Sequence, residues 1–416
     1  MEQYHIRGGN KLEGEYKLSG SKNAVLPILA ATLVTGNQCK INSCPNLSDV
    51  KNMFAILREL GCTVKDEGDG VVVDSSSISS YVIPEHLMRE MRSSVFLMGP
   101  MIARFGKITL SYPGGCEIGS RPIDIHLSAL RQLGVTIKEN HGFLECSADK
   151  LVGTRIIFDF PSVGATENAM LAATGAEGET VLINPAKEPE VVDLQNFLNS
   201  CGAQITGAGT GEIVIHGKRP FHETEHKVIP DRIEGGTILT AAAVTGGTVN
   251  ITNAEPEHMS MTISKLREAG CSIIEGKNNV QIIAPERLKS IETIRTQPYP
   301  GFPTDMQSQM LTAMTVAQGT SVVTETIFEN RFKIVEELRK MGAKVKVDGR
   351  TAVVVGVKSL MGARVKARDL RGGASLVIAG LCAEGDTIVE NIEHIDRGYD
   401  KIEKDLSKIG ANIIRV

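Results

Sequence analysis

Six copies of the pattern Leu-x-x-x-Gly-x-x-[Ile/Val] run along the chain and constrain its fold more than any other feature. The copies begin at Leu57, Leu130, Leu198, Leu266, Leu338 and Leu406. Subtraction of residue numbers places their glycines, from Gly61 to Gly410, 68 to 73 residues apart. Self-similarity at a nearly fixed period is the signature of one structural unit repeated along a chain. The sequence therefore predicts six copies of one unit.

Two helical segments are predicted in each unit. The first segment is apolar on all sides and covers residues 24–34, 95–103, 165–175, 237–244, 310–317 and 375–381 in the six copies. The second is amphipathic and ends at the repeated glycine, which is typical of a left-handed helix cap, and a predicted β-hairpin follows. A helix that is hydrophobic on every side is buried on every side. We therefore expect an α/β fold in which sheets and amphipathic helices surround buried helices.

The length of 416 residues favours two domains, which would hold three repeats each. The sixth unit stops at Val416 after one strand, where the other units continue into a returning strand and a further extended segment. Residues 5–8 and 12–18 have the same pattern as residues 353–356 and 360–366 and supply what the last unit lacks. We therefore expect an N-terminal lobe of residues 21–231 and a discontinuous C-terminal lobe of residues 1–20 and 232–416, joined by two chain crossings that form a hinge.

Composition excludes several classes of protein. A net charge of −4 gives no global attraction to nucleic acid or to an anionic membrane. The longest apolar runs, such as residues 24–34, are too short to cross a bilayer and lack the basic start of a signal peptide, so we expect a cytoplasmic protein without membrane insertion. The eight cysteines and nine histidines show no disulfide or metal-ligand spacing, and no nucleotide-binding loop motif occurs, which predicts no metal and no cofactor.

The residues just before each apolar helix differ between the repeats and are polar. They are residues 21–23, 92–94, 162–167, 231–232, 304–305 and 369–371. Helix capping explains hydroxyl and carboxyl groups such as that of Thr166. Capping does not call for Lys22, Arg92, Arg232 or Arg371, because a cation at a helix N-terminus costs about 0.3–1 kcal/mol unless an anion lies between them. Arg121, Arg331 and Arg397 precede the amphipathic helices, and together these cations predict a cleft for a polyanion.

Two further residues are candidates for the chemistry. Cys116 lies in the glycine-rich run 113–122 close to Arg121, and a nearby cation favours its thiolate form. That makes the thiol either a nucleophile or an acid that exchanges a proton near neutral pH. Asp305 is a carboxylate among cationic neighbours, which fits either a general base or a helix cap.

Six short motifs together resemble the enolpyruvyl transferases that act on UDP-N-acetylglucosamine. They are Ser21-Lys22-Asn23-Ala24, Pro113-Gly114-Gly115-Cys116, Gly119 to Asp124, Phe302-Pro303-Thr304-Asp305, Glu329-Asn330-Arg331-Phe332 and His394 to Tyr399. The resemblance extends from the first strand to the last helix. It implies a two-domain inside-out α/β barrel and transfer of the enolpyruvyl group of phosphoenolpyruvate to the 3-hydroxyl of UDP-N-acetylglucosamine with loss of phosphate. It also implies the first committed step of peptidoglycan synthesis and sensitivity to fosfomycin.

The resemblance implies a role for each matching residue. Cys116 would protonate the methylene carbon of phosphoenolpyruvate and could also attack C2, and Asp305 would take the proton of the sugar hydroxyl. The phosphate and carboxylate of phosphoenolpyruvate would be held by Lys22, Arg121, Arg331 and Arg397. The UDP-sugar would contact Asn23, Arg92, Arg121, Pro122, Ile123, Asp124, Ile125, Ser162, Val163, Gly164, Asp305 and Ile327. Asp369 and Arg371 would pair near the cleft and help it to close.

The sequence departs from the family pattern at a few positions and leaves two alternative functions. Glu117 and Ser120 replace alanines that are common beside the loop cysteine, and Gly372-Gly373 follow Arg371 where alanine or serine is frequent. Pro161 replaces a lysine that some members carry before the serine of residues 162–164. The alternatives are the 3-phosphoshikimate reaction on the same fold, against which Cys116 and the run 113–124 argue, and a paralogue that binds a UDP-sugar without catalysis.

Overall fold

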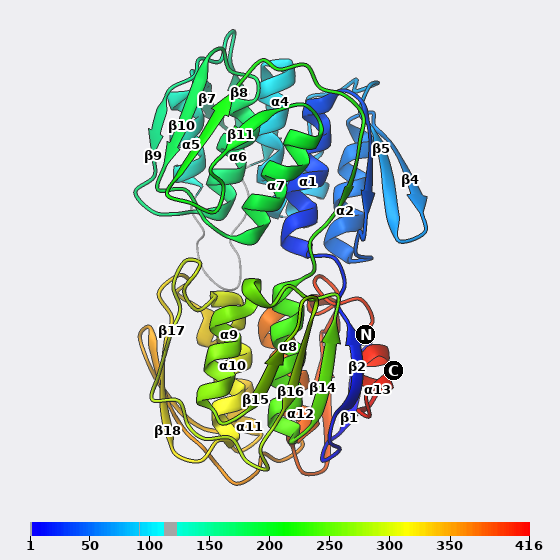
Figure 1. Ribbon diagram of the computed structural model, residues 1–416, viewed down its shortest axis with the longest axis vertical. Coiled ribbons are helices and arrows are strands. Elements are labelled where there is room, and N and C mark those ends of the chain that lie inside the picture. The colour runs from blue at the N-terminus through cyan, green and yellow to red at the C-terminus, as the bar shows by residue number, and fades with distance from the viewer. Residues whose placement is uncertain (1, 91, 112–122) are drawn as a thin grey trace. The chain divides into compact units, whose positions relative to one another are not determined.

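The computed structural model describes residues 2–90, 92–111 and 123–416 and contains two compact units. The N-terminal unit comprises the described residues between 20 and 229, and the C-terminal unit comprises residues 2–19 and 230–416. Each unit has its own hydrophobic core. Figure 1 shows the elements of both.

The first helix of each repeat lies in the centre of its unit. In the N-terminal unit these helices are α1 (Lys22–Thr35), α4 (Met98–Phe105) and α6 (Val163–Ala173), and in the C-terminal unit they are α8 (Arg232–Thr245), α10 (Gln307–Val316) and α12 (Leu370–Cys382). The three helices of each unit pack against one another. In α10, for example, every residue from Gln307 to Thr315 is buried. The predicted burial of these helices is confirmed.

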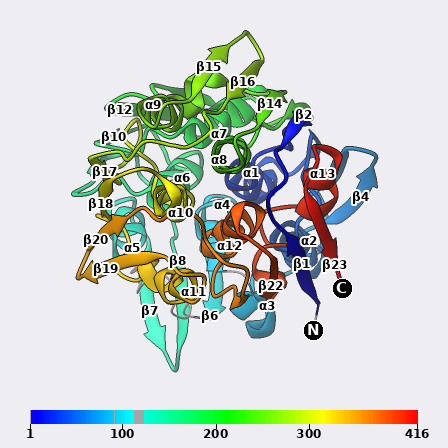
Figure 2. The ribbon, with the colours of Figure 1, turned by 90° about the horizontal axis from the view of Figure 1, so that it is seen from below.

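The second helices are amphipathic and lie farther out, as Figure 2 shows for the C-terminal unit. They are α2 (Ser48–Glu59), α5 (Asp124–Gln132), α7 (Pro189–Ser200), α9 (Ser260–Glu268), α11 (Ile334–Lys340) and α13 (Ile402–Lys408). The repeated glycines after them all have positive φ, from 90° at Gly342 to 110° at Gly202. Glycine adopts this conformation without steric cost, so the predicted left-handed caps are confirmed.

Short additional helices connect these elements. They are α3 (Glu85–Glu90) and the 3-10 helices η1 (Arg92–Leu97), η2 (Pro256–Met259), η3 (Thr304–Met306), η4 (Arg331–Lys333) and η5 (Ile392–His394). The apolar helix expected over residues 95–103 therefore begins as η1 and becomes α-helical only at Met98. This start places Pro100 in the first turn of α4, where its missing N–H leaves no hydrogen bond unmade.

Each repeat contributes one small sheet, and the sheets share one strand order. In the N-terminal unit the strand orders are β13-β3-β5-β4, β6-β8-β7 and β9-β10-β12-β11. These strands are β3 (Gln38–Asn42), β4 (Thr63–Glu67), β5 (Gly70–Asp74), β6 (Lys107–Ser111), β7 (Thr136–Asn140), β8 (Phe143–Ser147), β9 (Arg155–Ile157), β10 (Glu179–Ile183), β11 (Gln204–Thr206), β12 (Glu212–His216) and β13 (Thr224–Lys227). In the C-terminal unit the strand orders are β2-β14-β16-β15, β17-β18-β20-β19 and β21-β22-β1-β23. These strands are β1 (Gln3–Arg7), β2 (Glu13–Lys17), β14 (Thr248–Thr252), β15 (Ser272–Glu275), β16 (Asn279–Ile283), β17 (Thr293–Arg295), β18 (Thr320–Thr324), β19 (Lys344–Asp348), β20 (Thr351–Val355), β21 (Arg364–Lys366), β22 (Asp386–Glu390) and β23 (Asn412–Arg415). The strand after the buried helix pairs antiparallel with the returning hairpin strand. In five sheets it also pairs parallel with a short edge strand.

The N-terminal strands fill the places that the sixth repeat leaves open. β1 pairs antiparallel with β22 and β23, in the position that the returning hairpin strand holds in the other sheets. β2 is the parallel edge strand of β14 in the fourth repeat. The expectation that residues 5–8 and 12–18 supply the strands missing from the last repeat is confirmed by this pairing.

Two further observations concern the chain as a whole. The segments that connect the units are hydrogen-bonded to each other, since the backbone N–H of Ser21 donates to the carbonyl of Ile229 at 2.7 Å and that of Asp231 to the carbonyl of Ser19 at 3.0 Å. Within the described ranges, no helix is long and apolar enough to span a membrane.

Candidate active site

The structure describes most of the predicted site residues, but not all. Cys116, Arg121 and Pro122 lie outside the described residues. Arg92 begins η1, but its side chain also lies outside the described part of the chain. The other predicted residues lie in the described part of the chain, some in each unit.

Lys22 is the first residue of α1 in the N-terminal unit. Ser21 caps the helix by accepting a hydrogen bond from the N–H of Ala24 at 3.4 Å. The side chain of Lys22 is 10% exposed, and its ammonium group lies 2.6 Å from Oδ2 of Asp49, which is buried in the first turn of α2. A buried cation beside a helix N-terminus needs such a counter-charge. Asn23 follows and is half-buried.

Residues 162–164 lie beside α5 in the same unit. Ser162 caps α6 by accepting from the N–H of Ala165 at 3.4 Å. A Cβ atom on Gly164 would lie 3.0 Å from a ring carbon of His126, so the close approach of α6 to α5 favours glycine here. α5 begins with Asp124 and Ile125, directly after the buried Ile123. The structure thus brings the two N-terminal groups 123–125 and 162–164 together.

Asn168 holds this region together and was not predicted from the sequence. Its Oδ1 accepts from the N–H of Gly99 at 2.6 Å, and its Nδ2 donates to the carbonyl of Val95 at 2.8 Å and lies 3.1 Å from Nδ1 of His126.

The expectation that Thr166 caps a helix was wrong, because its hydroxyl accepts from the N–H of Ala186 at 3.0 Å.

Asp305 lies between two buried arginines in the C-terminal unit. Its Oδ1 accepts from Nη2 of Arg331 at 2.5 Å, and its Oδ2 accepts from Nη2 of Arg371 at 3.1 Å. The side chains of Arg331 and Arg371 are 2% and 3% exposed, whereas that of Asp305 is 24% exposed. The carboxylate therefore has a face that is still accessible, and two fixed cations surround it.

The guanidinium of Arg371 is held from several sides. It donates to Oδ2 of Asp305 and, through Nη1, to the hydroxyl of Tyr399 at 3.2 Å. Burial by itself lowers the pKa of Arg371, but Asp305, Tyr399 and Asp231 together outweigh this effect, so the pKa lies above its ordinary value. For Tyr399 the effect of burial has the opposite sign: burial raises the pKa of the hydroxyl, and the charge of Arg371 opposes this rise. Arg371 is therefore a permanent buried cation.

Asp369 and Arg371 do not pair as expected from the resemblance. Oδ1 of Asp369 accepts from the backbone N–H of Arg371 at 3.1 Å and of Gly372 at 2.9 Å, which makes Asp369 the cap of α12. The guanidinium of Arg371 contacts Asp305 instead. The reason is geometric, because a residue that caps its own helix directs its carboxylate at the first backbone N–H groups.

The remaining predicted residues of the C-terminal unit are Ile327 and Arg397. The N–H of Ile327 donates to Oε1 of Glu325 at 2.7 Å, and the Ile327 side chain is half-buried. Arg397 lies in a turn after η5 and is also half-buried. Asp396, its neighbour, is bound by Arg415.

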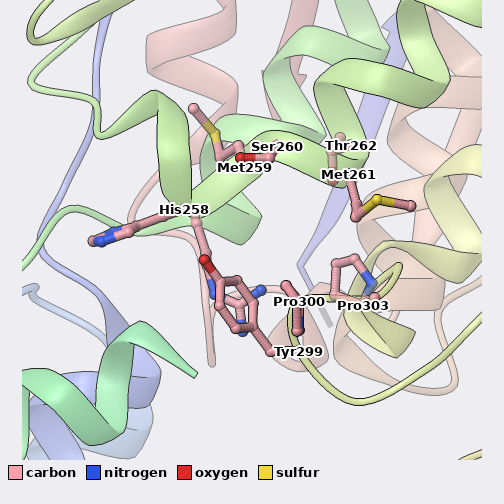
Figure 3. Close-up of a pocket in the computed structure, with 10 residues that line it drawn as sticks. His258, Met259, Ser260, Met261, Thr262, Tyr299, Pro300 and Pro303 are labelled. Carbon is pink, nitrogen blue, oxygen red and sulfur yellow. The ribbon is translucent and has the colours of Figure 1, made fainter. Parts of the chain in front are cut away.

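A small hollow lies beside the Pro303 turn, and Figure 3 shows the side chains that line it. Asp231 caps α8 by accepting from the N–H groups of Ile233 and Glu234. The guanidinium of Arg232 lies 5.6 Å from the ring centroid of Tyr299 in this hollow, which is a cation–π contact. Arg232, expected as a cation that faces an anion, thus contacts an aromatic ring next to the Asp305 turn.

Each unit therefore presents fixed cations and polar groups at the starts of its buried helices. Lys22 is held at the start of α1, and Arg331 and Arg371 lie near the starts of α10 and α12. A carboxylate between two immobile guanidinium groups can accept a proton, while the guanidinium groups stabilise negative charge that develops nearby. This combination suits transfer of a group that carries phosphate or carboxylate.

The comparisons with known proteins agree with this chemistry. A family model described as EPSP synthase (3-phosphoshikimate 1-carboxyvinyltransferase) matches residues 6–406. UDP-N-acetylglucosamine 1-carboxyvinyltransferase 2 of Caldanaerobacter subterraneus subsp. tengcongensis is 53% identical, with 100% of both chains covered. UDP-N-acetylglucosamine 1-carboxyvinyltransferase 1 of Symbiobacterium thermophilum is 52% identical and covers 100% of this chain and 95% of its own.

Solved structures show the same fold. The enolpyruvyl transferase NikO from Streptomyces tendae has a TM-score of 0.90 at 26% identity, and covers 100% of this chain and 99% of its own. EPSP synthase from Acinetobacter baumannii has a TM-score of 0.75 at 18% identity, with 100% of both chains covered. The inside-out α/β architecture expected from the resemblance is thereby confirmed. The chain belongs to the enolpyruvyl transferase family.

Proposed function

We propose that this protein transfers the enolpyruvyl group of phosphoenolpyruvate to the 3-hydroxyl of UDP-N-acetylglucosamine and releases phosphate. The observation that carries the proposal is the identity of 53% and 52%, over the whole chain, to two relatives named for this reaction. The family model is described by the 3-phosphoshikimate reaction, so it supports enolpyruvyl transfer but does not choose the acceptor. The sequence run 113–124 with Cys116 favours the UDP-sugar.

Two proton transfers are assigned to Asp305 and Cys116. In the addition step, the 3-hydroxyl oxygen bonds to C2 of phosphoenolpyruvate, Asp305 accepts the hydroxyl proton, and the thiol of Cys116 gives a proton to C3. In the elimination step, the thiolate of Cys116 takes a proton back from C3, the C2–O bond to phosphate breaks, and the proton held by Asp305 leaves with the phosphate, which restores the double bond and both side chains. The accessible face of Asp305 supports its part, since a general base must reach the proton it removes.

The tetrahedral intermediate carries phosphate and carboxylate on one carbon, and fixed cations stabilise that arrangement. We assign this role to Lys22, Arg121, Arg331 and Arg397. Because Arg331 is buried and tied to Asp305, it needs little rearrangement as charge develops. The rate benefits only where these contacts are stronger in the transition state than in the bound substrates.

The UDP-sugar is assigned to the polar groups at the helix starts. The proposed contacts are Asn23, Arg92, Arg121, Pro122, Ile123, Asp124, Ile125, Ser162, Val163, Gly164, Asp305 and Ile327, with Asp369 and Arg371 ordering the neighbouring backbone and carboxylate. We further propose that the lobes formed by residues 21–231 and by residues 1–20 and 232–416 close around both substrates in the cytoplasm. Closure excludes water from the intermediate.

The proposal is tested by measuring phosphate release from phosphoenolpyruvate with each acceptor in turn. We expect release with UDP-N-acetylglucosamine and none with 3-phosphoshikimate or without an acceptor. Release with 3-phosphoshikimate alone would transfer the proposal to the alternative acceptor. No release with either acceptor, from protein that binds UDP-N-acetylglucosamine, would identify a non-catalytic paralogue.

A further inference from the structure

One position shared by the repeats differs in the fifth copy. In three other repeats, an asparagine with positive φ comes directly after the strand that follows the buried helix: Asn184, Asn253 and Asn391. Each asparagine donates a hydrogen bond from Nδ2 to the backbone carbonyl of the residue that follows the parallel edge strand, namely Phe158, Leu18 and Ala367. The asparagine thus ties the edge strand to the rest of its sheet.

The fifth repeat has Glu325 at this position, and its side chain is fully buried. Oε1 of Glu325 accepts from the hydroxyl of Thr296 at 2.9 Å, and Thr296 is the residue that follows edge strand β17. The tie to the edge strand is therefore kept. The carboxylate also makes three contacts that have no counterpart in the asparagine ties.

These additional contacts involve two segments of the proposed site. Oε2 of Glu325 accepts from the hydroxyl of Thr304 at 2.9 Å, and Thr304 begins η3 directly before Asp305. Oε1 also accepts from the backbone N–H of Ile327 at 2.7 Å and of Phe328 at 3.1 Å. One buried carboxylate therefore fixes both the turn that carries Asp305 and the backbone at Ile327.

The replacement has no explanation in the stability of the sheet. A neutral asparagine makes the tie in three repeats, whereas a buried carboxylate adds a desolvation cost that its four donors must offset. The additional contacts instead fix the position of the Asp305 carboxylate. Asp305 binds Arg331 and Arg371 through a short side chain, so any shift of its turn also moves the carboxylate.

We infer that Glu325 is a positioning residue for enolpyruvyl transfer, which acts by holding the turn of Asp305 and the backbone at Ile327. The inference rests on the proposed function, in which Asp305 accepts the hydroxyl proton and Ile327 contacts the UDP-sugar. A displacement of about 1 Å of a reacting group costs roughly 10²-fold in rate. Loss of the Glu325 contacts is therefore expected to lower kcat while the fold is kept.

The decisive variant is Glu325→Asn, which installs the residue that three other repeats use. We expect it to fold with the secondary structure of the wild type, to lose roughly 10- to 100-fold in kcat and to raise KM for UDP-N-acetylglucosamine. Glu325→Gln keeps the side-chain length and an acceptor for both N–H groups, so it should retain most of the rate. As a control, Asn253→Ala removes the corresponding tie in the fourth repeat and should leave kcat and both KM values unchanged.

Thr304→Val supplies a second test that leaves Glu325 in place. It removes only the hydroxyl that Oε2 binds, and we expect a smaller fall in kcat in the same direction. Wild-type kcat and KM in folded Glu325→Asn, or wild-type kcat in Thr304→Val, would overturn the role of Glu325 while an active wild type upholds the proposed function. A wild type that turns over no UDP-N-acetylglucosamine would overturn the proposed function and this role with it.

Discussion

Glu234 makes the C-terminal unit sensitive to pH, and Glu234→Gln tests how strongly. This residue lies in the first turn of α8, is 6% exposed, and accepts from the hydroxyl of Tyr16 at 2.7 Å and from the N–H of Ser19 at 3.1 Å. Burial, with a contribution from Asp231, outweighs these hydrogen bonds and raises its pKa to about 8 from an ordinary value of 4.5. In the folded chain, Glu234 is therefore mostly protonated at neutral pH.

The sign of the effect follows from proton binding. Between pH 4.5 and pH 8 the folded chain holds a proton on Glu234 and the unfolded chain does not, so stability falls as the pH rises. Below pH 4.5 both states are protonated and the residue contributes no penalty. Above pH 8 the penalty is complete and amounts to about 5 kcal/mol, at about 1.36 kcal/mol for each pH unit between the two pKa values.

Urea unfolding of the wild type and of Glu234→Gln at pH 6 and pH 9 measures this penalty. The chain has no tryptophan, and four of its six tyrosines (Tyr4, Tyr16, Tyr299 and Tyr399) belong to the C-terminal unit, so tyrosine emission reports mainly that unit. From pH 6 to pH 9 we expect the wild type to lose about 3 kcal/mol more than Glu234→Gln. Glu13→Gln, at an exposed position in β2, controls for removal of a carboxylate. Parallel pH dependence of the wild type and Glu234→Gln would refute the reasoning.

Three further predictions concern the proposed site. Asp305→Ala should lower turnover roughly 10²- to 10⁴-fold, as expected for loss of a general base, and an unchanged rate in steady-state kinetics would leave Asp305 only its ion pairs with Arg331 and Arg371. Cys116→Ala should be inactive, while Cys116→Asp should remain active and escape inactivation by fosfomycin; full activity of Cys116→Ala would reject a catalytic thiol. Asp49→Asn removes the carboxylate charge that lies 2.6 Å from the buried ammonium of Lys22, which should destabilise the N-terminal unit by roughly 3–5 kcal/mol in chemical unfolding; a shift of under about 1 kcal/mol would show that Asp49 contributes little to the neutralisation of Lys22.

The parts of the fold that depend on burial could be predicted from the sequence. A helix in the middle of a unit must be apolar on every side, and a glycine is favoured where the chain turns with positive φ. Apolar runs and glycines therefore recur at a nearly fixed spacing in the sequence. The strands borrowed from the N-terminus were predictable because the last repeat lacks them. The boundary at α4 was not, because the preference of Pro100 for the first turn is a local effect within an otherwise apolar run.

The partners of the site residues could not be predicted, because they depend on contacts between elements that are separated in the sequence. Lys22 pairs with a residue in the next helix, and Asp305 pairs with arginines that lie 26 and 66 residues farther along the chain. Asp49 is typical of the first turn of any amphipathic helix and gave no signal of its own. Glu325 did leave a signal, since it is acidic where three repeats have asparagine, but its meaning depends on the hydroxyls and N–H groups that surround it.

In the proposed reaction, the C2–O bond of phosphoenolpyruvate breaks as the enolpyruvyl group moves to the UDP-sugar. Phosphoenolpyruvate labelled with ¹⁸O in the oxygen between C2 and phosphorus tests it directly, with mass spectrometry of all products. We expect the label to leave entirely in inorganic phosphate, in an amount equal to the enolpyruvyl-UDP-N-acetylglucosamine formed. Label that remains in pyruvate, with unmodified UDP-N-acetylglucosamine, would show simple phosphate-ester hydrolysis and would contradict it.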